Sequence, residues 1–303
     1  MLVDGGSSDN TVQIINSFAE KSPIPFQIIV EKGANIARGR NLAIEKAKYE
    51  VIAITDCGCR LDEDWLENLI APFAINPETQ VVAGWYRAID AQGQKHPFKG
   101  VPLLDQVEPQ SFVPSSRSLA LTKSAWKQSG GYPEWLTLTG EDTYFALELK
   151  RFCLHWAFVP SAIVSWIGPQ NWTEAWKKAY SWSTGNGEIG YNAWLYRMLG
   201  KKIIGAIFVT IFIFIILISA FNIFLQTPVW LILIASLFLI EILAWIAIKF
   251  FPYSPLSIFI GDIGTRLMQV QGFWDGAKRK SKIDLKTPSS NTRLSVYYGW
   301  GSN

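Results

Sequence analysis

Two long apolar runs, residues 203–225 and 229–248, constrain this chain more than any other feature. Each run is long enough to cross a bilayer core of about 30 Å at about 1.5 Å per helical residue. Buried core helices of a soluble protein are the alternative, but such helices seldom stay apolar on every face over this length. The sequence therefore predicts a transmembrane hairpin whose turn is Gln226-Thr227-Pro228.

Basic residues flank the outer ends of the hairpin and predict its orientation. Lys201 and Lys202 precede the first run, Lys249 follows the second, and a basic cluster lies near residue 280. The positive-inside rule then places the N-terminal domain and the tail in the cytoplasm of a multi-pass inner-membrane protein. The net charge is only +3 and basic residues do not interleave with aromatic ones, so we expect membrane lipids and no nucleic acid as partners.

The first part of the chain alternates strand and helix patterns. A strand ends at Leu2-Val3, and strands at 25–31 and 50–56 alternate with helices at 7–21 and 35–48. A further helix at 61–73 has Asp62 as its expected N-cap. Strands that alternate with helices through short links indicate an α/β fold with a mostly parallel sheet covered by helices.

Two turns carry the residue types that a nucleotide diphosphate requires. Asp4-Gly5-Gly6 follows the first strand, and Asp56 follows the strand at 50–56. Ligands of such sheets bind beyond the carboxyl ends of the strands. One carboxylate there can accept hydrogen bonds from a base or ribose, and another can hold a divalent cation against phosphates. A simple turn followed by a helix N-cap is the alternative for residues 4–9.

Four segments, taken together, carry a family resemblance. They are "VDGGSSDNT", "GANIARGRNLAIEKA", "ITDCGCRLDEDWL" and "SGGYPEWLTLTGEDTYFALELKR", and the apolar hairpin follows them. In this order the set resembles the membrane-associated glycosyltransferases of family 2, which have the GT-A fold, over residues 1 to about 190. The resemblance implies an inverting transfer of a sugar from a nucleotide diphosphate sugar to an acceptor.

The resemblance also implies roles for residues at the nucleotide. Asp4 matches the acidic residue at the base, and Gly5 lets the backbone approach the nucleotide. Arg40 matches a basic residue close to the nucleotide, although a solvated helix arginine is the alternative. Asp56 matches the first acid of the D-x-D metal motif and would hold Mg²⁺ or Mn²⁺. Gly58 stands where the family has a second aspartate, so water and phosphate oxygens would complete the coordination.

Glu141-Asp142 resembles the family's catalytic acidic pair. An inverting transfer needs a carboxylate that accepts the proton of the acceptor hydroxyl as its oxygen attacks the anomeric carbon. The resemblance assigns this role to Asp142, with Glu141 in support. The alternative is a pair of acids that only stabilise the first turn of a helix.

The segments of the chain are expected to run in the following order: a catalytic domain over 1–165, a Trp-rich interfacial segment over 166–200, the hairpin over 201–250, and an amphipathic, basic tail over 251–303. Trp172, Trp176 and Tyr180 recur at four-residue spacing. They could stack on sugars, but their nearness to the predicted spans favours the membrane interface. No Q-x-x-R-W run is present, which argues against a polymer-extruding synthase.

Membrane attachment favours a lipid or a lipid-linked saccharide as the acceptor. A catalytically inactive nucleotide-sugar binding protein and a membrane nucleotidyltransferase are the rival interpretations. The chain starts at the family's second strand, so we expect Met1 to be an internal methionine of a longer protein, or the gene to be truncated. About 30 to 50 upstream residues would supply the β-α unit that precedes this strand.

Overall fold

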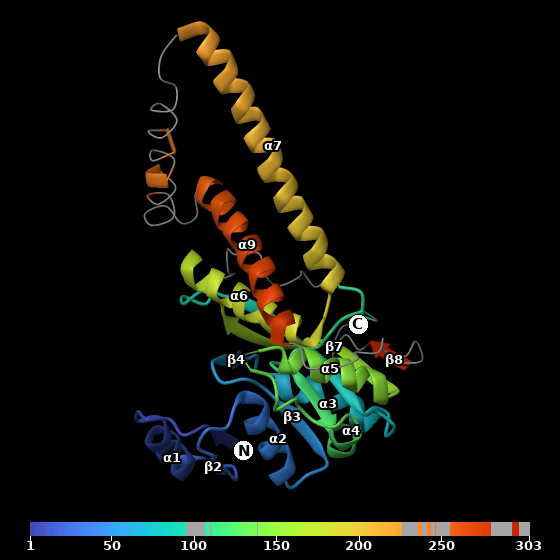
Figure 1. Ribbon diagram of the computed structural model, residues 1–303. Helices are drawn as coiled ribbons and strands as arrows, with labels where there is room; N and C mark the ends of the chain where they lie inside the picture. The colour runs from blue at the N-terminus through green and yellow to red at the C-terminus, as the bar shows by residue number, and fades with distance from the viewer. Residues whose placement is uncertain are drawn as a thin grey trace. The chain divides into compact units, whose positions relative to one another are not determined.

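The computed structural model describes residues 1–94, 107–109, 111–137, 139–225, 236–237, 241–243, 246, 255–279 and 293–296. The chain divides into two compact units, Met1–Gly168 with Lys286–Asn303, and Pro169–Leu285. The strands belong to the first unit, and the second contains the helices α6, α7 and α9 (Figure 1).

The first unit begins with the predicted alternation of strands and helices. Its elements are β1 (Leu2–Asp4), α1 (Thr11–Lys21), β2 (Ile28–Val30), α2 (Ile36–Lys46) and β3 (Val51–Ile54). β1 and β2 pair in parallel as a two-stranded sheet, with Leu2 opposite Ile28. A parallel pair requires a crossover connection, and α1 supplies it.

The larger sheet is mixed, so the predicted mostly parallel sheet is wrong. Its further strands are β4 (Cys59–Leu61), β5 (Val81–Ile89), β6 (Leu119–Thr122), β7 (His155–Ile167) and β8 (Arg293–Val296). The strand order is β3-β6-β5-β7-β4, with β8 beside β7. β5 and β8 run parallel to β7, whereas β3–β6, β5–β6 and β4–β7 are antiparallel. β6 therefore returns antiparallel beside β5, with Val81 opposite Leu121.

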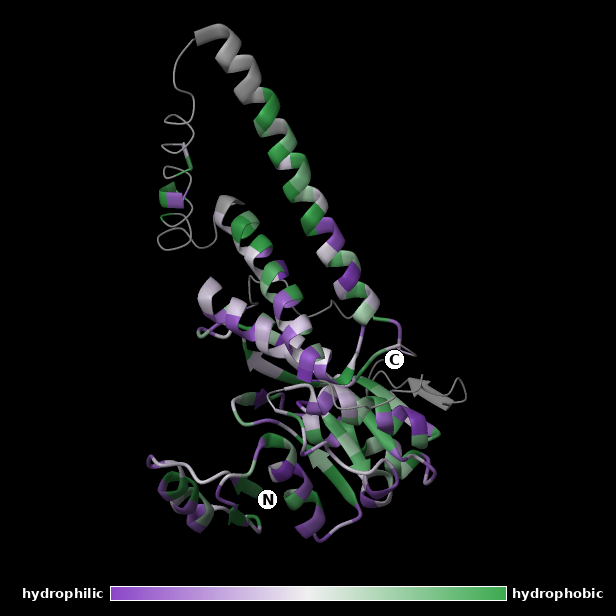
Figure 2. Cartoon of the chain, in the orientation of Figure 1, coloured by the Kyte–Doolittle hydropathy of each residue, from purple (hydrophilic) through white to green (hydrophobic). Residues whose placement is uncertain are grey.

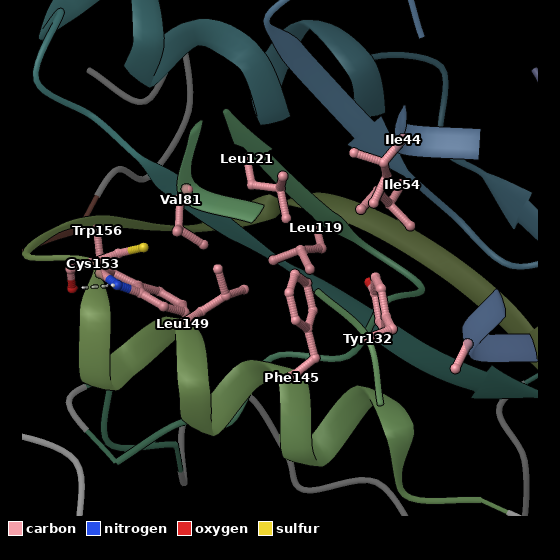
Figure 3. Packing of buried hydrophobic residues seen from close by; sticks show 12 residues of the cluster. Ile44, Ile54, Val81, Leu119, Leu121, Tyr132, Phe145, Leu149, Cys153 and Trp156 are labelled. Carbon is pink, nitrogen blue, oxygen red and sulfur yellow. Dashed lines mark hydrogen bonds between the residues drawn. The ribbon is translucent and has the colours of Figure 1, made fainter. Parts of the chain in front are cut away.

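Helices cover both faces of this sheet. They are α3 (Trp65–Ile75), α4 (Lys123–Gln128) and α5 (Glu141–Phe152). Figure 3 shows Phe145 and Leu149 pointing from α5 toward Leu119 and Leu121 of β6, in one buried cluster. Ala120, which lies between those two leucines, belongs instead to the cluster that α3 forms on the opposite face. This alternation follows from the two-residue period of a strand.

Asp62 does not cap α3, contrary to the sequence prediction. The helix begins at Trp65 with Asp64 in the N-cap position. The carboxylate of Asp62 accepts a hydrogen bond of 2.9 Å from Arg87 of β5, and its backbone carbonyl accepts one from the Trp65 N–H. The Asp62 side chain, which the sequence predicted as the cap of this helix, therefore binds Arg87 of the sheet instead.

Among the described residues of the second unit, one helix is long and apolar enough to cross a membrane. α7 (Ala193–Leu225) includes the whole of the first predicted span, and its candidate stretch is Ala193–Ile216. Figure 2 shows mixed colours at the start of α7 and apolar green through its middle. The turn at 226–228 and nearly all of the second predicted span lie outside the described residues.

α6 (Trp172–Ile189) packs along α9 (Pro255–Arg279) within this unit. Trp172 is 4% exposed, and its indole N–H donates to Ser257 of α9. The Trp176 indole N–H donates to the carbonyl of Gly261 at 3.0 Å. The ring of Trp172 is therefore covered by α9, and the position of this segment at the membrane interface stays a prediction.

Glycines of α9 permit this close approach, which leads to a stability prediction. A Cβ at Gly276 would overlap the backbone carbonyl of Thr184 in α6. We expect Gly276→Ala to lower the free energy of unfolding by about 1 to 3 kcal/mol, because the added methyl forces the helices apart. Thermal unfolding in detergent measures this. Gly205 of α7 has open space around it, so Gly205→Ala is the control and should be neutral or slightly stabilising. Equal losses in both variants would contradict the role of the close contact.

Candidate active site

The turn after β1 is organised around Asp4. Its carboxylate accepts hydrogen bonds from the Gly6 N–H (2.9 Å), the Ser7 N–H (2.8 Å) and the Ser7 hydroxyl (2.7 Å). These donors, with the Ser7 hydroxyl first, lower the pKa of Asp4. Gly6 has φ +94°, a conformation that favours glycine. Asp4 is thus an ionised acceptor that holds its own turn in shape.

Gly5 allows the loops after β1 and β2 to lie close together. A Cβ at Gly5 would stand 2.9 Å from the carbonyl of Ala34, and the Gly5 carbonyl accepts a hydrogen bond from the Gly33 N–H. A larger residue would push these loops apart. The sequence predicted that Gly5 lets the backbone approach the nucleotide. In the structure, the group close to Gly5 is the backbone of the loop after β2.

Arg40 joins two of the predicted carboxylates. It lies on α2, which begins after Asn35, whose side chain accepts a hydrogen bond from the Arg38 N–H. One nitrogen of the Arg40 guanidinium donates to Asp56 at 2.5 Å, and another donates to Glu141 at 2.7 Å. Asp56 and Glu141 lie 16 and 101 positions from Arg40 in sequence. The interpretation of Arg40 as a solvated helix residue is therefore wrong.

The surroundings of Arg40 are largely buried. The guanidinium carbon lies 5.2 Å from the ring centroid of Tyr132, whose hydroxyl hydrogen-bonds Ser116 at 2.8 Å. The Glu141 side chain is only 11% exposed. Burial, and then the charge of Asp142, raise the pKa of Glu141, while Arg40 opposes this rise. The positive charge of Arg40 thus offsets the free-energy cost of burying the negative charges of Asp56 and Glu141.

Asp142 stands beside this group at the start of α5. Its Oδ1 accepts from the Thr143 N–H at 2.8 Å, and its Oδ2 accepts from the Ser115 hydroxyl at 3.4 Å. The helix is entered through Gly140 at φ +97°, and its N-terminus carries a partial positive charge that favours carboxylates. The structure therefore places both predicted catalytic acids in the first turn of one helix.

Arg117 is a charged neighbour of this site that the sequence did not single out. Its guanidinium lies over the rings of Tyr86 and Trp166, at 5.1 and 4.7 Å from their centroids, and donates to the Ser115 hydroxyl at 3.0 Å. Ser115 in turn donates to Asp142. Only strand pairing across β5 and β7 brings the two rings together, so no local pattern could have identified the arrangement.

Asp56 is the residue that could hold a cation. Arg40 binds one of its oxygens, and Gly58 adopts φ +86° where a second acid was expected. Across the described part of the chain no three His, Cys, Asp or Glu side chains gather into a metal-binding group. A single carboxylate suffices for Mg²⁺ when phosphates and waters supply the other ligands. The donor set thus fits a cation that arrives with a diphosphate.

The predicted site residues fall into two groups. Arg40, Asp56 and Glu141 are in direct contact, and Asp142 adjoins Glu141 in α5. Within the described residues, the hydrogen bonds to the Asp4 side chain come from Gly6 and Ser7. The structure thus assembles the acids around Arg40, and no hydrogen bond joins Asp4 to them.

Comparisons with known proteins match most of the chain. The family model Glycosyl transferase family 2 matches residues 1–127, and Glycosyl transferase family group 2 matches residues 106–250. Poly-beta-1,6-N-acetyl-D-glucosamine synthase of Staphylococcus epidermidis is 25% identical over 202 residues, which are 62% of this chain and 47% of that protein. Probable glycosyltransferase YdaM of Bacillus subtilis is 22% identical over 226 residues, 69% of this chain and 53% of that one. The chain spans about half the length of these relatives.

Solved structures show weaker similarity. A mannosyltransferase, PcManGT from Pyrobaculum calidifontis in complex with GDP-Man and Mn²⁺, has a TM-score of 0.45 and 17% identity, over 60% of this chain and 51% of that one. TarS 1–349 of S. aureus in complex with UDP-GlcNAc has a TM-score of 0.44 and 16% identity, over 59% of this chain and 56% of that one.

Proposed function

Because the chain belongs to glycosyltransferase family 2, we propose that it transfers a sugar from a nucleotide diphosphate sugar to an acceptor, with inversion at the anomeric carbon and on a GT-A fold. The contact of Arg40 with both Asp56 and Glu141 carries this proposal. Through one guanidinium, Asp56, the acid expected at the diphosphate, lies close to Glu141, which directly precedes the expected base Asp142. A sugar transfer needs these two chemistries side by side.

Asp142 acts as the general base. It accepts the proton of the acceptor hydroxyl as that oxygen bonds to the anomeric carbon, and the bond to the nucleoside diphosphate breaks. The hydrogen bonds from Thr143 and Ser115 orient the carboxylate. Glu141 does not touch the reacting atoms in this scheme, and it positions Arg40.

Asp4, Gly5, Arg40 and Asp56 form the donor side of the proposed site. Asp4 accepts from the base or ribose, and the turn at Gly5 lies against the nucleotide. Asp56 and the phosphates would hold Mg²⁺ or Mn²⁺, which neutralises charge on the leaving diphosphate when bound. Arg40 supplies positive charge at the same place.

The acceptor is a lipid or a lipid-linked saccharide at the inner membrane. The apolar α7 and the similarity to a poly-N-acetylglucosamine synthase support this choice. The residues 203–225 and 229–248 would form the membrane hairpin, with the catalytic unit and the tail in the cytoplasm. Membrane lipids then contact the hairpin and the basic tail.

An inactive nucleotide-sugar binding protein is the second candidate. Gly58 in place of a second acid, together with Arg40 on an oxygen of Asp56, favours it. Such a protein would bind the donor without consuming it.

Product analysis separates the two candidates. The full chain in detergent is given a panel of nucleotide sugars, beginning with UDP-N-acetylglucosamine, with membrane lipid extract and Mg²⁺ or Mn²⁺. Mass spectrometry should find a glycosylated lipid and an equal amount of nucleoside diphosphate. Donor binding without product would favour the inactive protein, and a lack of donor binding would contradict both candidates.

Membrane topology can be tested by cysteine labelling in intact cells. Cys57 is exposed in the first unit and serves as a native reporter. We expect an impermeant maleimide to label Thr227→Cys from outside and to label Cys57 only after permeabilisation, because the positive-inside rule keeps the flanking lysines inside. Labelling of Cys57 in the parent chain in intact cells would contradict this orientation.

A further inference from the structure

A concavity lies between α5 and the segment that precedes it, residues 128–135. It has a volume of about 540 Å³, and its lining includes Asn41, Gln128, Glu134, Trp135, Tyr144 and Glu148. Tyr144, Glu148 and Phe152 follow at four-residue intervals, so they share one face of the helix. Phe145 and Leu149 form the neighbouring face that packs on the sheet.

Aromatic rings form part of the lining without being buried in a core. Trp135 is 43% exposed, and its ring meets the Tyr144 ring edge-on at 5.5 Å between centroids. Burial and the charge of Glu148 raise the pKa of Tyr144, so its hydroxyl remains a donor at neutral pH. An exposed indole beside a phenol offers a flat apolar surface with a polar edge.

Carboxylates and amides surround these rings, and their charges are balanced. Glu134 lies 3.7 Å from Arg38 and accepts from Asn41, while Glu148 lies 3.7 Å from Arg151. These oxygens would accept hydrogen bonds from hydroxyl groups, whereas they would repel a phosphate. Flat aromatic faces and several acceptors together suit the ring of a neutral sugar.

Tyr132 and α5 connect the concavity to the proposed catalytic acids. Tyr132 lines it, and the ring of Tyr132 also lies under Arg40 and packs on Phe145 at 4.0 Å. Along α5, Glu148 lies about 9 Å from Asp142 at about 1.5 Å per residue. A saccharide held here would therefore lie on the helix that carries the proposed base.

We propose that this concavity binds a neutral saccharide, the part of the acceptor that lies beyond the sugar being extended. The assignment rests on the proposed transferase function for the identity of the ligand as an acceptor. Trp135 stacks on a sugar ring, Glu134 and Glu148 accept hydrogen bonds from its hydroxyls, and the amide of Gln128 accepts or donates one. The nucleotide binds elsewhere, at Asp4 and Asp56.

Direct binding tests the proposal without requiring turnover. The probe is a β-1,6-linked N-acetylglucosamine trisaccharide, titrated calorimetrically into the full chain in detergent. We expect Trp135→Ala to weaken its binding about tenfold, the ratio that corresponds to the loss of an aromatic contact, and Trp135→Phe to retain part of it. Affinity for uridine diphosphate should be unchanged, which also shows that the variants are folded. Trp194→Ala, which removes a 65% exposed indole from α7, is the matched control.

The outcomes separate this inference from the proposed function. The saccharide site would be overturned if the parent and Trp135→Ala bound the trisaccharide equally well. It would also be overturned if the parent bound uridine diphosphate but not the trisaccharide. Neither result would contradict the proposed transferase function. Binding that depends on Trp135, without consumption of any nucleotide sugar, would support the saccharide site and overturn the transferase proposal.

Discussion

Replacing Asp142 by asparagine is expected to lower turnover by roughly 100-fold or more, the usual scale for the loss of a general base. The amide oxygen can still accept from the Thr143 N–H, so the first turn of α5 should keep its shape. It cannot accept the proton of the acceptor hydroxyl. Nucleotide binding should change little, because Asp56 and Arg40 are untouched. Steady-state rates, with donor affinity measured separately, test both halves of the expectation.

Asp64→Asn provides the matched control for that variant. Asp64 is an exposed acid in the N-cap position of α3, and its side chain makes no cap hydrogen bond. It should retain the parent's rate. Parent-like turnover in Asp142→Asn would remove Asp142 from the mechanism, and a loss of donor affinity in that variant would assign it to the nucleotide.

Arg40→Ala is expected to reduce the free energy of unfolding by about 3 to 5 kcal/mol, the scale for leaving a buried ionic partner uncompensated. Arg40 is 14% exposed as a side chain, and its partners Glu141 and Asp56 are 11% and 26% exposed. Donor affinity should fall as well, because two carboxylates without their cation repel the diphosphate. Chemical unfolding of the parent and the variant measures the first effect.

The stability lost in Arg40→Ala should depend on pH, because Glu141 titrates. Its pKa in the folded protein is raised above the usual 4.5, so stability falls as the pH rises from 4.5 through the folded value. Arg40 lowers this pKa, so its removal raises the pKa of Glu141 further. The pH range over which stability falls then becomes wider. Arg40→Ala should therefore cost more at about pH 8 than at about pH 5.

A double variant isolates this contribution. Arg40→Ala with Glu141→Gln should recover part of the lost stability and should show a weaker pH dependence, because no charge remains at position 141. Glu148→Gln in the same background is the control, since Glu148 is a buried acid of α5 that pairs with Arg151 at 3.7 Å. An equal cost of Arg40→Ala at every pH, or recovery by the control alone, would contradict the ionic account.

The sequence by itself determined the local elements of this protein. The strands and helices from β1 to β3, the start of α5 at Glu141 and the apolar α7 all follow from periodicity, turn residues and hydropathy. These signals lie within a few residues of each other, so they can be read along the chain. The roles of Asp56 and Asp142 came from the resemblance of the motifs to a family, and they remain predictions.

Only the tertiary structure decided strand direction and the contacts between distant residues. The return of β6 beside β5 makes the sheet mixed, and α9 covers the ring of Trp172 in α6. The ion pair of Arg40 with Glu141 crosses 101 positions, and the stacking of Arg117 requires β5 and β7 as neighbours. Such contacts depend on which surfaces become buried together, and no short stretch of sequence contains that information.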